Sequence, residues 1–150
     1  MKKFLSVFLL TGFLLSLSAC QGESPKADFA LADAQTLLDS AAFSEPLEEL
    51  DLEIACSLYG LDQSKITEAA VYGSTGATAE ELAVFVFTDA EAASAAKANF
   101  ETRISDRAEA MKDYIPTEVP KLEKAVLEVR GNTLLFVVAN DYAPVEELLK

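Results

Sequence analysis

Carboxylates are the side chains of this sequence whose number and spacing most suggest chemistry. Glu80 and Glu81 are adjacent and stand just before an apolar run. Five further acids lie close together, at Glu45, Glu48, Glu49, Asp51 and Glu53. A pair of carboxylates can act as acid and base on a glycoside, and clustered carboxylates can bind a hard cation such as calcium.

Neither carboxylate pattern is specific. Neighbouring residues of a strand point to opposite faces, so Glu80 and Glu81 are poorly placed to act as a pair. We interpret them as surface or strand-start residues. The acidic run lacks the D-x-[DN]-x-[DN]-G pattern of a calcium loop. A solvated face of mutually repelling charges is the interpretation we favour, with cation binding as the alternative.

Other short motifs also have simple structural interpretations. Ser94 and Lys97 match the S-x-x-K motif of penicillin-binding enzymes, but the companion S-D-N and K-T-G motifs are absent. The turn from Gly73 to Gly76 resembles a phosphate loop, but no G-K-[ST] follows it, which favours a hairpin connection. The tyrosines are expected as core or rim aromatics; they are Tyr59, Tyr72, Tyr114 and Tyr142. We therefore predict no catalytic residue, no metal site and no cofactor.

The composition excludes several classes of protein. The chain has 150 residues, 12 basic and 25 acidic side chains and no histidine. A net charge of -13 argues against nucleic-acid binding, because phosphates require clustered Lys and Arg. The lack of histidine removes the commonest general base and the commonest metal ligand. The length suits one domain with one hydrophobic core.

The first twenty residues have the pattern of a secretion signal. Two lysines precede an apolar run that is shorter than the ~20 residues a membrane-spanning helix needs. The run ends in Leu17, Ser18, Ala19 and Cys20. This segment resembles a bacterial lipoprotein signal with its lipobox at residues 17–20. The resemblance implies removal of residues 1–19 and acylation of the Cys20 thiol. An ordinary signal peptide with an incidental cysteine is the alternative.

Lipidation would place the domain on the outer face of the cell membrane. The remaining chain would carry ten basic and 25 acidic side chains, so anionic headgroups would repel it. Two or more lipid chains hold a protein stably on a bilayer. With Cys20 acylated, Cys56 has no partner for an intramolecular disulfide. Cys56 lies in an apolar helical pattern, typical of a buried cysteine that packs as a small hydrophobic residue.

After the signal, the pattern predicts a short tether at residues 20–28 and one domain at residues 29–150. Helices are expected at about residues 29–43, within 45–59 and ended by Gly60, at 88–112 and at 141–150. Strands are expected at 66–72, 82–87, 125–130 and 133–139. The order α-α-β-β-α-β-β-α with hairpin connections predicts an α+β fold. Its four-stranded, mainly antiparallel sheet would pack on one long amphipathic helix.

The arrangement of these elements can also be predicted. Thr88 to Glu91 has capping-box spacing, with Thr88 as the capping hydroxyl of the long helix. Its apolar stripe is Ala93, Ala96, Phe100, Ile104, Ala108 and Met111. The runs at 82–87 and 134–138 are apolar on both faces, so these strands should be central. The hairpin turn at Gly131-Asn132 then gives the strand order 1-2-4-3. Pro116 and Pro120 indicate a loop, and Pro144 the first turn of the last helix.

Several stretches together suggest a family. They are LYGL at 58–61, AVY at 70–72, GATAEELAVF at 76–85, DYIP at 113–116, PKL at 120–122 and VRGN at 129–132. In order and spacing they resemble the domain-of-unknown-function family 4358, over about residues 30–149. The resemblance implies a single α+β domain in a small lipoprotein or secreted protein, mostly of anaerobic Gram-positive bacteria. It implies no catalytic residue.

These observations together predict a lipid-anchored, extracytoplasmic protein of the bacterial cell envelope. A non-enzymatic binding or interaction module with an envelope protein partner is the function we favour. A small-ligand or cation-binding lipoprotein that uses its acidic surface is the alternative. A small enzyme is less favoured, because it would have to work with Asp, Glu, Ser, Tyr or Lys alone.

Overall fold

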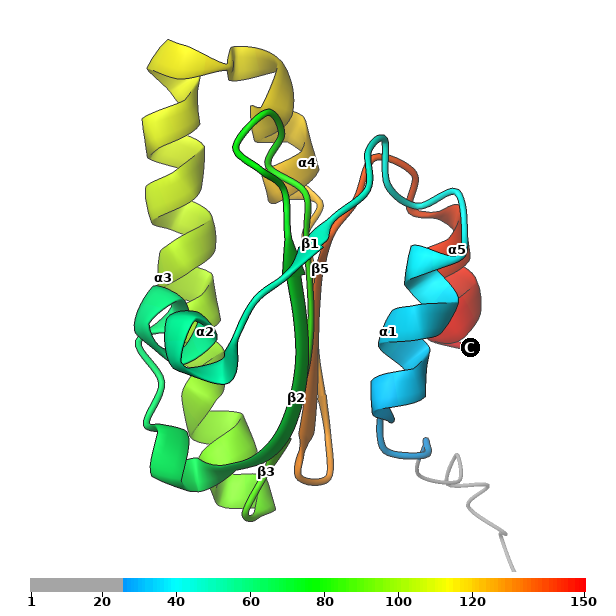
Figure 1. The fold of residues 1–150 in the computed structure, drawn as a ribbon, viewed down its shortest axis with the longest axis vertical. Helices are drawn as coiled ribbons and strands as arrows, with labels where there is room; N and C mark the ends of the chain where they lie inside the picture. Colours follow the sequence, from blue (N-terminus) through cyan, green and yellow to red (C-terminus); the bar gives the residue numbers. More distant parts are fainter. Residues whose placement is uncertain (1–25) are drawn as a thin grey trace, which may run out of the picture.

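The structure is a computed structural model that describes residues 26–150. The signal, the lipobox and Cys20 lie outside the described residues, so the structure does not test the predicted lipid attachment. Within residues 26–150 the chain forms a single antiparallel sheet with helices on both faces (Figure 1).

The sheet has five strands in the order β1-β2-β3-β5-β4. Their bounds are β1 Glu48–Glu49, β2 Ile66–Gly73, β3 Glu81–Phe87, β4 Val126–Arg130 and β5 Thr133–Val138. The four predicted strands and their order are confirmed. The prediction of four strands was one short, because Glu48 and Glu49 pair with Gly73 and Tyr72 at the sheet edge. Two exposed residues show no alternation that a sequence pattern could detect.

Strands β3 and β5 form the centre of the sheet, as predicted. All six residues of β5 are buried, and side chains of β3 alternate between two separate hydrophobic clusters. Ala83, Phe85 and Phe87 belong to one cluster, and Leu82 and Val84 belong to the other. This period of two places successive residues on opposite faces of the sheet.

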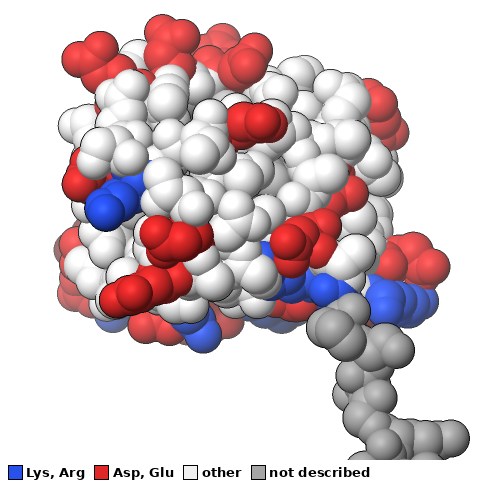
Figure 2. Space-filling view, turned by 90° about the horizontal axis from the view of Figure 1, so that it is seen from below, with Lys and Arg blue, Asp and Glu red and all other residues white. Residues whose placement is uncertain are grey.

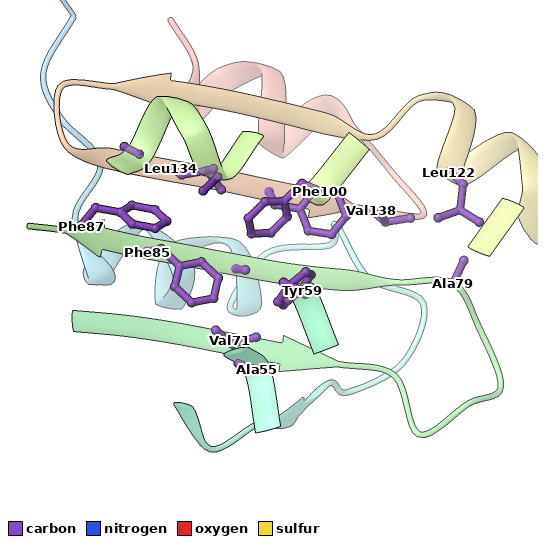
Figure 3. Close-up of a cluster of buried hydrophobic side chains, with 14 residues drawn as sticks. Ala55, Tyr59, Val71, Ala79, Phe85, Phe87, Phe100, Leu122, Leu134 and Val138 are labelled. Carbon is purple, nitrogen blue, oxygen red and sulfur yellow. The ribbon is translucent and has the colours of Figure 1, made fainter. Parts of the chain in front are cut away.

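Helices α2 (Leu52–Tyr59) and α3 (Ala90–Tyr114) cover one face, and α1 (Leu31–Leu38) and α5 (Ala143–Leu148) cover the other (Figure 1). The predicted stripe of α3 packs on the sheet. Close-packed aromatic rings fill this side, with Tyr59 stacked on Phe100 at 4.6 Å between ring centres (Figure 3). Phe100 lies 5.2 Å from the Phe136 ring. One face of the sheet thus holds an aromatic core and the other a mainly aliphatic one.

The ends of the helices differ from the prediction in detail. Asp89, not Thr88, caps α3, and its carboxylate accepts a hydrogen bond of 2.8 Å from the Ala92 amide. The predicted end of α2 at Gly60 is confirmed, because Gly60 adopts a left-handed conformation with φ of +64°. The first helix is shorter than the predicted 29–43, and α2 begins only at Leu52.

The segment with Pro116 and Pro120 is helical, contrary to the predicted loop. It forms a 3-10 turn, η2 (Pro116–Glu118), and a short helix, α4 (Val119–Glu123). Each proline lies in the first turn of its element, where its missing N–H leaves no hydrogen bond unmade. Another 3-10 turn, η1 (Gln63–Lys65), links α2 to β2. Pro144 lies in the first turn of α5, as predicted.

Candidate functional site

Glu81, the first residue of β3, is buried within an ion-pair network on the α3 side of the sheet. The guanidinium of Arg103 donates from Nε to Oε2 at 3.0 Å and from Nη2 to Oε1 at 2.6 Å. Arg107 makes a salt bridge to the same Oε1, and the Tyr59 hydroxyl donates to Oε2 at 3.0 Å. Because Arg103 and Arg107 are four residues apart on α3, both reach the carboxylate from one helix face.

Glu80 is buried in a second network beside the first. Lys121 of α4 lies 2.7 Å from its Oε1, and the Ser44 amide donates to Oε2 at 2.8 Å. Lys121 also pairs with Glu118 at 3.0 Å, and the Glu118 carboxylate accepts the Ala79 amide at 2.9 Å. Three acids and three bases therefore neutralise one another at this end of the sheet.

Glu81 begins β3, so the interpretation as a strand-start residue is confirmed for it. The expectation that Glu80 and Glu81 lie on the surface is wrong. Their side chains are 0% and 2% exposed. Their basic partners follow 22 to 41 residues later, so no local pattern could pair them. A sequence signal did exist for two of these partners. Arg103 and Arg107 lie next to the buried stripe of α3, where a charged residue needs an ionic partner.

The surroundings keep Glu80 and Lys121 ionised and Tyr59 protonated. Burial opposes ionisation of Glu80, but hydrogen bonds from Lys121 and Ser44 outweigh it, so the Glu80 pKa lies below its ordinary value. Burial likewise opposes the charge of Lys121, but Glu80 and Glu118 raise the Lys121 pKa. Burial raises the pKa of Tyr59 to about 12, so its phenol stays protonated and donates to Glu81. The arrangement suits a structural clamp on the loop 74–80, rather than a proton donor at neutral pH.

The remaining candidate residues lie apart from this network. Ser94 and Lys97 are exposed on α3, and Lys97 lies 3.9 Å from Glu101. The Gly73–Gly76 turn connects β2 to β3 as predicted. The Ser74 hydroxyl accepts the Gly76 and Thr78 amides there. The acids at 48, 49, 51 and 53 are exposed, as expected for a solvated face.

Glu45, Cys56 and Tyr114 were also considered in the sequence, as was a metal site. Glu45 is half-buried, unlike the rest of the acidic run, because its carboxylate accepts hydrogen bonds from the Ser74 and Thr78 hydroxyls. Over residues 26–150, no group of three or more acids or cysteines could hold a metal ion. Cys56 is buried as predicted, and its burial raises the thiol pKa. Tyr114 is not a core or rim residue, since it is 80% exposed at the end of α3, beyond the sheet.

An open groove of about 420 Å³ lies between α2 and α3. Tyr59 and Arg103 line it, with the Arg103 guanidinium 5.0 Å from the centre of the Tyr59 ring. A shallower hollow beside it is lined by Glu53, Ile54, Ser57 and Leu58 of α2. Ile54 is 53% and Leu58 39% exposed, and of the described residues only Tyr114 is another large exposed hydrophobic residue. This surface can receive apolar side chains from outside.

A second groove, of about 470 Å³, continues along α3 toward its N-terminus. Gly60 and Asn99 border both grooves, and the Asn99 amide donates to the Gly60 carbonyl at 2.7 Å between them. The carboxylates of this second groove include Asp62 and Asp89, which accept amide hydrogen bonds from Ser64 and Ala92. Those two acids therefore have structural partners.

The fold and the site define a small α+β domain whose buried charges pair internally and whose open surface is a groove between two helices. The chain belongs to the family described as Domain of unknown function (DUF4358), whose family model matches residues 39–139. The resemblance predicted from the sequence is thus confirmed. Helices α1 and α5 lie outside the matched range. Searches of the curated proteins and of the solved structures found no match. None of the helices in residues 26–150 has the length and apolarity to cross a bilayer.

Proposed function

We propose that this protein is a lipid-anchored, extracytoplasmic binding module of the bacterial cell envelope. The observation that carries the proposal is the N-terminal sequence, a positively charged start and an apolar run that ends at the lipobox residues 17–20. Acylation of the Cys20 thiol and removal of residues 1–19 would join the lipid to a folded domain that begins only a few residues later.

The start of the domain supports a close attachment. The Phe29 amide donates to the Thr133 hydroxyl at 2.9 Å, and the Arg130 guanidinium lies 4.2 Å from the Phe29 ring centre. Lys26 lies six positions after Cys20, so an extended tether reaches about 20 Å at most. The described chain begins at the lower end of the domain, where the visible face carries both acidic and basic side chains, with basic ones beside the start of the chain (Figure 2). The net negative charge of the chain as a whole would be repelled by anionic headgroups.

Binding fits the site better than catalysis does. The two buried acids that could have served as acid and base are held by Lys121 and Arg103. Every buried side-chain nitrogen and oxygen in residues 26–150 has a hydrogen-bond partner within the domain. The groove between α2 and α3 and the hollow beside it, by contrast, combine exposed apolar side chains with open volume. Such a surface is typical of a protein-interaction site.

Metabolic labelling with a fatty acid that carries a clickable group tests the anchor. We expect the wild-type chain and the Cys56→Ser variant to be labelled and found in the membrane fraction. The Cys20→Ser variant should be unlabelled and retain its signal, because the acyl acceptor is missing. Labelling that persists in Cys20→Ser, or an unlabelled wild type, would contradict the lipid anchor.

In-cell chemical crosslinking followed by mass spectrometry tests the binding role. A reproducible envelope protein as the main adduct is the expected result. Adducts only with lipid, cell wall and copies of the chain itself would contradict an interaction module. They would favour a ligand-binding role instead.

A further inference from the structure

Two exposed hydrophobic residues lie one helical turn apart on α2. Ile54 and Leu58 are four residues apart, so they share one face of the helix. The opposite face of α2 is already buried, through Ala55 and Tyr59 in the aromatic core. A helix that is apolar on both faces is typical of one buried on both sides. In the described part of the chain, nothing covers the face of Ile54.

The neighbouring face of α3 forms the second wall of the groove. Ala98, Thr102 and Asp106 border it and are spaced by four residues, so they form one ridge along α3. The floor between the walls is the Tyr59 ring with the Arg103 guanidinium beside it. Figure 1 shows α2 and α3 on the same face of the sheet, and the residues that line the channel come from both helices. A channel between two helices matches the groove into which a third helix packs.

The charges around this channel indicate which charge a bound partner should carry. The charged residues of the groove are Arg103 and Asp106, and Glu53 lines the adjoining hollow on α2. Arg103 pairs with Glu81 within the domain. The charged side chains that remain available to a partner, Glu53 and Asp106, are negative. Electrostatic complementarity therefore favours an occupant with basic side chains beside its apolar ones. A second copy of this acidic chain would bring like charges together.

We propose that the groove between α2 and α3 binds a basic amphipathic helix of a partner protein. Apolar side chains of that helix, three or four residues apart, lie against Ile54 and Leu58. Its Lys or Arg side chains lie near Glu53 and Asp106. This proposal rests on the proposed binding function and specifies where and what the module binds.

Site-specific photo-crosslinking of the full-length chain in its own membrane tests the proposal. A photoreactive residue replaces the exposed Ser57, between Ile54 and Leu58, or the exposed Glu123 of α4 as a control. Mass spectrometry then identifies the crosslinked segment. We expect an adduct from position 57 only, with a segment that has apolar residues at helical spacing and several Lys or Arg. No adduct, a second copy of the chain, a lipid, or an acidic or non-helical segment would overturn the proposal.

Matched variants distinguish binding in the groove from non-specific hydrophobic binding. Ile54→Ser and Leu58→Ser together should reduce the adduct at least tenfold, whereas Tyr114→Ser, the third exposed hydrophobic position, should leave it unchanged. Asp106→Lys should also reduce it, and Glu123→Lys should not. Unchanged melting temperatures of the variants would show that they fold. Equal adduct yields for groove and control variants would overturn the proposal.

The binding function and the groove proposal can be tested separately. A general crosslinker used in the same cells captures envelope partners wherever they contact the domain. If it still yields an envelope protein while position 57 yields no basic helix, the binding function stands and the groove is wrong. If neither yields a partner, both are wrong.

Discussion

Glu80 and Glu81 are neighbours in the chain, yet each carboxylate is buried in its own ion-pair network. Glu81 faces the α3 side, where Arg103 and Arg107 bind it, and Glu80 is held by Lys121 and Ser44. Alternation along β3 separates the two side chains, because successive residues of a strand point to opposite faces. Glu81 thereby attaches the end of the loop 74–80 to α3, and Glu80 attaches it to α4.

Removal of the Glu81 charge should destabilise the domain strongly. Glu81→Gln leaves two half-buried guanidinium groups facing a neutral amide, and breaking a buried ion pair costs about 3–5 kcal/mol. The free energy of unfolding in urea measures this, with the exposed Glu123→Gln as the control near zero. Tyr59→Phe removes only the hydroxyl donor and should cost about 1.5–3 kcal/mol. A loss below about 1 kcal/mol for Glu81→Gln would show that the network contributes little.

The ion pair of Glu80 should make stability depend on pH in the acid range. The Glu80 pKa is lowered in the folded state, so its contribution is present above its unfolded-state pKa of about 4.3. That contribution is lost as the pH falls through the lower, folded-state pKa. The difference in unfolding free energy between wild type and Glu80→Gln should therefore be constant near neutral pH and shrink in acid. A difference that widens in acid would mean that the folded-state pKa is raised.

The start of α3 distinguishes two candidate caps. Asp89→Ala removes the carboxylate that accepts the Ala92 amide and should cost about 1 kcal/mol of unfolding free energy. Thr88→Ala removes the hydroxyl that the sequence pattern favours and should change stability by less than about 0.5 kcal/mol. Thermal unfolding of the two variants measures both values. The reverse order would restore Thr88 as the cap.

The hairpin between β4 and β5 depends on a left-handed residue. Gly131 has φ of +53°, so Gly131→Ala should cost about 1–2 kcal/mol, and Gly131→Asn less, because Asn tolerates this region. A Cβ there would clash with the Asp28 carboxylate, but this exposed side chain can move aside. We therefore expect Asp28→Ala to restore little of the Gly131→Ala loss in chemical denaturation. Full restoration would assign the loss to the clash rather than to the backbone.

Cys56 should be unreactive in the folded protein. Its side chain is buried and its thiol pKa is raised, chiefly by burial, and reactivity requires the thiolate. In the Cys20→Ser chain Cys56 is the only thiol. An aromatic disulfide reagent should modify it slowly under native conditions and completely in denaturant. Rapid native modification would show that α2 opens readily.

Much of the framework could be predicted because its signals are local. The apolar runs at 82–87 and 134–138 identified the two central strands, and the spacing from Ala93 to Met111 identified α3. The turn residues Gly60 and Gly131 marked an end of helix and a hairpin, since both require a left-handed backbone. Lipidation at Cys20 is likewise a prediction from a short contiguous pattern, and it lies outside the described residues.

The sequence by itself determined the α+β class, the antiparallel strand order and the membership of the family. These follow from the spacing of apolar residues, the turn residues and the order of motifs, which are all properties of residues close together in the chain. Only the tertiary structure decided that Glu80 and Glu81 are buried, that β1 extends the sheet, and that Ile54 and Leu58 are exposed at the hollow beside the groove between α2 and α3. Each of those facts depends on residues brought together from distant parts of the chain. The burial of an acid is decided by whether a distant base can reach it, and the exposure of an apolar residue by which helix packs beside it.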